Sequence, residues 1–65
     1  MYALIDEPKG GVLKDAFNAL DEAFGTEEFS REQAVSAIAM ELEVDDARAE
    51  ELLKNLVARN CVEES

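Results

Sequence analysis

Three side chains in the last third of the chain could hydrogen-bond to the edges of nucleic-acid bases. Arg48, Asn55 and Arg59 are spaced seven and four residues apart, so at about 100° per residue they line up along one side of a helix. Arginine pairs with guanine edges and asparagine with adenine edges. With Lys54 on a neighbouring line of the helix, the spacing predicts a nucleic-acid contact surface made of these four residues.

A second interpretation of the same residues is a solvated helix surface with local ion pairs. Glu51 stands at helical spacing from both Arg48 and Lys54, where it could pair with either. The first turn of such a helix usually meets the groove of DNA, and here it carries Asp45 and Asp46, which would face phosphates and repel them. The sequence leaves both interpretations open.

Catalytic and metal chemistry have little support. Cys61 is the only cysteine and there is no histidine, so the thiol has no base to activate it and a zinc site of the usual type is excluded. The segment "LDEAFGTEEFSREQ" superficially resembles a calcium-binding loop, but placing Gly25 at its glycine position puts Leu20 and Phe24 at ligand positions. We therefore expect a protein that is not an enzyme, with no cofactor and a buried, apolar Cys61.

The charge is extreme for 65 residues: 16 acids against 6 bases give −10. The acids are spread through every predicted helix, which indicates a folded acidic surface. Three origins stay open: adaptation to a high-salt (halophilic) host, docking on a basic protein partner, or ordinary acidity. The charge argues against tight phosphate binding at ordinary salt, but at ~1 M salt the screening length is only about 3 Å. No membrane span or signal peptide is evident, and the free thiol favours a cytoplasmic protein.

One domain spanning residues 1–65 must hold these side chains in place. Residues 1–11 form an arm or a short strand, because Pro8 and two adjacent glycines disfavour a helix. Tyr2, Leu4 and Ile5 in this arm either cover the core or meet a second subunit, which leaves a homodimer open. Apolar residues then recur on one helical face from Val12 to Phe24, and Gly25 suits the end of that helix.

Two more helices follow. Ser30 and Gln33 form a capping box that starts a helix at Arg31. Asp45 is a good N-cap for a third helix from Asp46 to about Arg59, after which Asn60 can adopt a left-handed cap. The apolar positions expected in the core of these two helices are Ala34, Val35, Ile38, Ala39, Leu42, Ala49, Leu52, Leu53, Leu56 and Val57. The final "CVEE" reads as a short strand or an extended tail.

Residues 12–64 resemble the helix-turn-helix and winged-helix superfamily. The resemblance is carried by extended Phe29 before a capped helix, by the apolar turn residues Leu42 and Val44, by the paired-leucine pattern "LLKNLV", and by the closing "NCVEE". It implies a mainly α fold with a three-helix helix-turn-helix core, which becomes a winged helix if a minimal β-sheet forms. No second wing strand is expected after "CVEE", so residues 2–5 or 27–29 must supply the partner strands.

Two functions follow from the resemblance and the charge. The first is a small non-enzymatic regulator that contacts DNA, as members of this superfamily do, in transcription regulation. The second is an acidic adaptor that uses the same fold to bind a basic protein. The basic surface of DNA-binding members is missing here, so the sequence does not decide between them.

Overall fold

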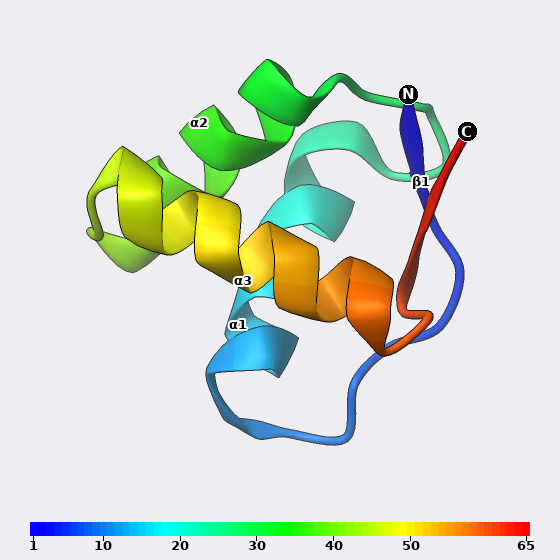
Figure 1. Ribbon diagram of the computed structural model, residues 1–65, viewed down its shortest axis with the longest axis horizontal. Coiled ribbons are helices and arrows are strands. Elements are labelled where there is room, and N and C mark those ends of the chain that lie inside the picture. The colour runs from blue at the N-terminus through cyan, green and yellow to red at the C-terminus, as the bar shows by residue number, and fades with distance from the viewer.

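The computed structural model describes residues 1–65 and contains three helices and a two-stranded antiparallel sheet (Figure 1). In chain order these are β1 (Tyr2–Leu4), α1 (Gly11–Phe24), α2 (Arg31–Leu42), α3 (Asp46–Ala58) and β2 (Val62–Glu64). The predicted mainly α class, with a three-helix core and a minimal sheet, is confirmed. The shape fits a helix-turn-helix, with α2 and α3 joined by the short turn 43–45.

Side-chain caps start α2 and α3 at the predicted residues. The Ser30 amide donates to Gln33 Oε1 at 2.8 Å, and the Gln33 amide donates to Ser30 Oγ at 3.1 Å, which completes the capping box. Asp45 Oδ1 accepts from the Arg48 amide at 2.8 Å. Both caps satisfy amides that a helix start leaves without partners.

Residues with positive φ end the helices. Gly25 (φ 60°, ψ −122°) follows α1 and its amide donates to the Asp21 carbonyl at 2.8 Å. Asn60, predicted to be left-handed, has φ 61°. Glu43 (φ 56°, ψ 47°) is a left-handed cap that the sequence did not indicate. Its conformation turns the chain so that the Val44 amide reaches the Ala39 carbonyl at 3.1 Å.

The sheet joins the two ends of the chain. β1 runs antiparallel to β2, with Tyr2 opposite Glu64 and Leu4 opposite Val62. On its other side Tyr2 forms a bridge to Phe29, with N···O distances of 2.7 and 2.9 Å. β1 therefore lies between β2 and Phe29. Of the two predicted partner segments, residues 2–5 supply the strand that pairs with β2, and residues 27–29 supply only the single bridge from Phe29 to Tyr2. The N and C ends lie side by side in Figure 1, and the α-amino group of Met1 donates to the Ser65 carbonyl at 2.8 Å.

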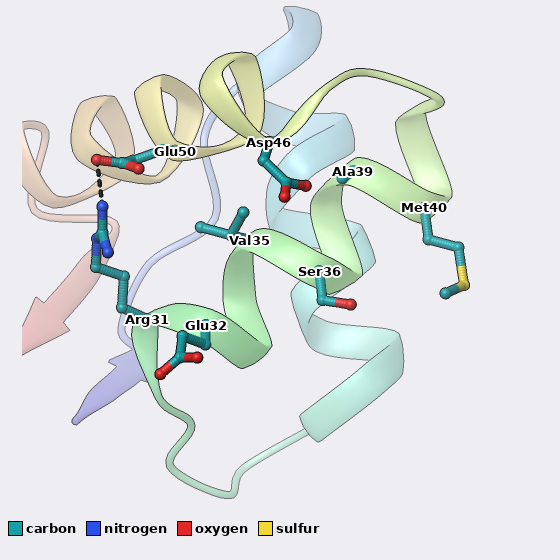
Figure 2. A pocket seen from close by; sticks show the side chains of 8 residues that line it. All are labelled: Arg31, Glu32, Val35, Ser36, Ala39, Met40, Asp46 and Glu50. Carbon is teal, nitrogen blue, oxygen red and sulfur yellow. Dashed lines mark ion pairs between the residues drawn. The ribbon is translucent and has the colours of Figure 1, made fainter.

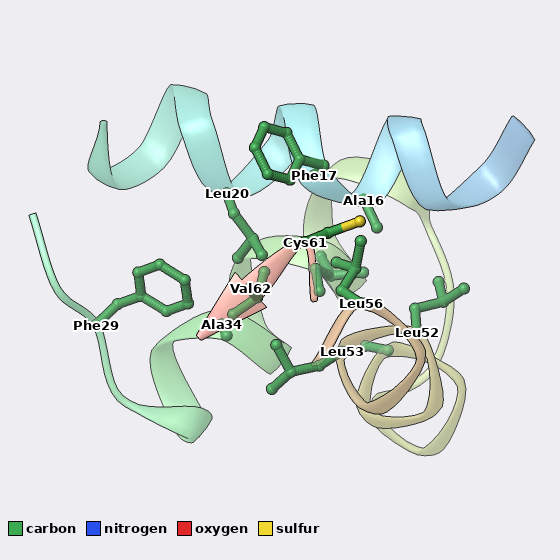
Figure 3. Close-up of a cluster of buried hydrophobic side chains, with 12 residues drawn as sticks. Ala16, Phe17, Leu20, Phe29, Ala34, Leu52, Leu53, Leu56, Cys61 and Val62 are labelled. Atoms are coloured by element: carbon green, nitrogen blue, oxygen red, sulfur yellow. The ribbon is translucent and has the colours of Figure 1, made fainter. Parts of the chain in front are cut away.

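One apolar cluster of 12 buried residues fills the space between the helices and the sheet (Figure 3). α1 contributes Phe17 and Leu20, and α3 contributes three leucines that are at most 2% exposed. Phe29 is fully buried and its ring stacks on Phe24, with centroids 4.8 Å apart. Cys61 is 7% exposed, which confirms the prediction of a buried thiol. Tyr2 and Leu4 pack against the cluster.

Candidate functional site

The outer surface of α3 carries the four residues predicted to contact nucleic acid. The opposite, buried side of the helix is formed by Ala49 and the three core leucines. Arg48, Asn55, Arg59 and Lys54 are all exposed. At about 100° per residue the first three share one flank of α3, although Arg59 is the C-cap, one residue beyond the last helical residue.

The three side chains on this flank differ in whether they already have a hydrogen-bond or ion-pair partner. Arg48 Nη1 is 2.7 Å from Glu51 Oε1, an ion pair one helical turn apart with both side chains largely solvated. This confirms the predicted local pairing of Arg48. Asn55 and Arg59 make no side-chain hydrogen bond or ion pair. Two of the three side chains are therefore available to a ligand without breaking a contact.

The other flank of α3 faces α2 and is occupied by a different set of charges. Glu50 pairs with Arg31 of α2 (Figure 2), and Lys54 Nζ lies 3.8 Å from the same Glu50 oxygen. The guanidinium of Arg31 lowers the pKa of Glu50, and Glu50 in turn raises the pKa of Arg31. Glu50 is half-buried and links two helices. Of the two ion pairs that the sequence offered to Glu51, only the one with Arg48 forms, because Lys54 pairs with Glu50.

Tyr2 forms a further polar contact that the sequence did not reveal. Its hydroxyl donates to Glu64 Oε2 at 3.3 Å across the sheet, while its ring stacks on Phe29 with centroids 6.1 Å apart. Burial raises the pKa of the Tyr2 hydroxyl, and the nearby Glu64 carboxylate raises it further. This contact adds a side-chain link between β1 and β2 to their backbone pairing.

Charge is unevenly divided between α3 and the rest of the chain. From Asp46 to Arg59, three acids (Asp46, Glu50, Glu51) are balanced by three bases (Arg48, Lys54, Arg59). The other 13 of the 16 acids and 3 of the 6 bases therefore carry the whole net charge of −10. α3 itself (Asp46–Ala58) thus carries a charge of −1, which the C-cap Arg59 offsets, on a strongly negative domain.

No group of three or more acidic or cysteine side chains is arranged to hold a metal ion. No helix is both long enough and apolar enough to cross a bilayer.

Comparison with known proteins returned no matching family model, no similar curated protein and no similar solved structure.

Proposed function

We propose that this chain is a small non-enzymatic domain of the helix-turn-helix or winged-helix type that associates with DNA through α3 and serves in transcription regulation. The observation that carries the proposal is the concentration of bases on α3 and its C-cap. On a domain of net charge −10, α3 and its C-cap Arg59 together hold three of the six bases and only three of the 16 acids. This concentration of bases reduces the repulsion that phosphate meets at α3.

The chemistry of the exposed flank supports the same assignment. Arg59 and Asn55 are unpaired donors and can approach base edges, where a good bidentate contact contributes roughly 1–3 kcal/mol of discrimination. Arg48 is held by Glu51 at 2.7 Å, but an exposed pair of this kind is worth only about 0.2–1 kcal/mol, so a phosphate can displace the carboxylate. A homodimer would present two copies of α3 to neighbouring turns of the duplex.

The test is a fluorescence anisotropy titration of short duplexes of random sequence, from about 0.1 to 2 M salt. We expect binding that weakens little with salt, because screening removes the repulsion from the 13 acids outside α3 along with the attraction to phosphate. Absence of binding throughout this range would end the proposal.

Matched variants locate the contact. Arg59→Ala should weaken binding about 5- to 150-fold if it reads a base, whereas Lys9→Ala, which removes the same charge from an exposed loop, should have little effect. Glu51→Gln should strengthen binding because it frees Arg48, and Glu22→Gln on α1 is its control. Equal effects of Glu51→Gln and Glu22→Gln would show that only net charge matters and that α3 is not the contact surface.

The distribution of acids favours one alternative. The surface outside α3 holds 13 of the 16 acids, which suits the docking of a basic protein. In this alternative the same fold is an acidic adaptor, and DNA binding is absent at every salt concentration.

A further inference from the structure

α2 and α3 enclose a groove of about 650 Å³ on the side of α3 opposite to Arg48 and Arg59. Its three apolar lining residues all come from α2, where Val35 and Ala39 stand four residues apart on the same side and Ser36 lies beside them. In Figure 2 the Val35 side chain points toward α3, and Asp46 points back across the groove. The Arg31–Glu50 pair lies at one end and Met40 at the other.

Met40 is the most exposed large apolar residue of the chain, at 77%. Its neighbours along the floor, Val35 and Ala39, are half-buried. A flexible thioether beside a shallow apolar floor adapts to varied partner side chains. The domain therefore has an apolar strip along α2 that its own core leaves partly uncovered.

The charges around this strip favour a positively charged partner. Three acids line the groove (Glu32, Asp46 and Glu50), against the single base Arg31. Arg31 is already paired with Glu50, so Glu32 and Asp46 remain as uncompensated negative charges. Phosphates of a nucleic acid are disfavoured here. A second copy of the chain is disfavoured too, because its own charge is −10 and like charges face to face are repulsive.

We propose that the α2–α3 groove binds an amphipathic, basic helix of a partner protein. Apolar residues on one face of that helix would contact Val35, Ala39 and Met40, and lysines or arginines flanking this face would pair with Glu32 and Asp46. This is the helix-in-groove mode of recognition, in which residues i, i+3, i+4 and i+7 of the bound helix contact the groove. The proposal does not depend on DNA binding by α3, because Arg48 and Arg59 lie on the opposite flank.

The probe is a synthetic helix of about 16 residues, roughly four turns, with leucines along one face and lysines elsewhere. Two controls keep its length: one permutes the leucines and lysines so that no face is apolar, and one replaces the lysines with glutamates. The isotope-labelled domain is titrated with each peptide at about 0.1 M salt, and the backbone amide shifts are mapped. We expect shifts confined to α2 and α3, and affinity at least tenfold higher for the amphipathic basic peptide than for either control.

Two variant pairs separate the apolar and the charged contributions. Met40→Ser should weaken binding about tenfold, while Ile5→Ser, at an exposed apolar residue outside the groove, should not. Glu32→Gln should weaken binding several-fold, while Glu63→Gln on β2 should not. Met40 and Ile5 are 77% and 56% exposed, so neither change should alter the melting temperature appreciably, which checks that the fold is retained.

Three results would overturn the proposal. One is a permuted peptide that binds as well as the amphipathic one, with shifts spread over every acidic face, because the contact would then be general electrostatics. Another is no detectable binding of the basic amphipathic peptide. The last is concentration-dependent dimerisation that Met40→Ser abolishes, because the groove would then be filled by a second copy of the chain.

Discussion

Salt should stabilise this fold strongly, and the size of the effect can be estimated from its dimensions. The net charge of −10 is confined to a domain whose Cα radius of gyration is 10.0 Å. Only three ion pairs offset it, and they involve three of the six bases. Mutual repulsion of the remaining charges disfavours the compact state, and screening relieves that repulsion.

The repulsion follows from treating the domain as a charged sphere. A radius of gyration of 10.0 Å corresponds to a sphere of about 13 Å radius. In water its self-repulsion is about 7 kcal/mol at ~0.1 M salt and about 3 kcal/mol at ~1 M. An unfolded chain of this length has a radius of gyration of about 25 Å, and the same values fall to about 1.5 and 0.5 kcal/mol. The difference stabilises the folded state by about 3 kcal/mol between these two salt concentrations.

The assay is thermal unfolding followed by circular dichroism in sodium chloride. A gain of about 3 kcal/mol should raise the melting temperature by roughly 12–24 °C for a domain of this size. A melting temperature that stays flat between the two concentrations would show that charge repulsion does not limit the stability of the fold.

A charge-reduced variant separates screening from the general effect of salt on apolar burial. Replacing five exposed, unpaired acids by their amides lowers the net charge from −10 to −5; the five are Asp21, Glu22, Glu27, Glu28 and Glu41. Because self-repulsion scales with the square of the charge, about a quarter of the salt response should remain. An undiminished response in this variant would assign the effect to apolar burial.

Three further perturbations test the packing, the cap and the interhelical ion pair. Phe29→Ala removes a fully buried ring that stacks on its neighbour and should cost about 3–5 kcal/mol. Since a domain of this length has only about 3–10 kcal/mol of stability, the variant should be largely unfolded by circular dichroism, and a cooperative wild-type-like melt would contradict this. Ser30→Ala should cost about 1 kcal/mol in urea unfolding, and an unchanged midpoint would mean that the capping box is not formed. The carboxyl of Glu50 should titrate by NMR below its ordinary pKa of 4.5 and return toward that value in Arg31→Gln. Its contribution to stability is therefore present above that value and lost as pH falls through the lowered pKa.

The local parts of this fold were readable from the sequence because their causes are local. The capping box needs only Ser30 and Gln33, and the start of α3 needs only Asp45. Each of these interactions lies within one helical turn, where residue type and spacing decide the outcome. The alignment of Arg48 with Asn55 on one flank is equally a matter of helical period.

Contacts between distant residues were not readable in this way. Glu50 forms an ion pair with a base on another helix, and no feature of its own helix indicates that partner. No period or spacing connects Arg31 with Glu50, because their meeting depends on how α2 packs on α3. The charge balance of α3 and its C-cap also requires the exact start of the helix, since counting from Glu43 adds two acids. The left-handed Glu43 was missed because its conformation is imposed by the turn and not by its own preference.

The pairing of β1 with β2 has a consequence for how the chain folds. Apart from the bridge to Phe29, β1 pairs with residues made at the end of the chain, and Tyr2 lies opposite Glu64. At about 5–20 residues per second, roughly 3–12 seconds of translation separate the two strands. The helices rely on contacts closer in sequence, which form far faster. β1 is synthesised first but is therefore expected to pack last, so formation of the sheet should be the final step of folding.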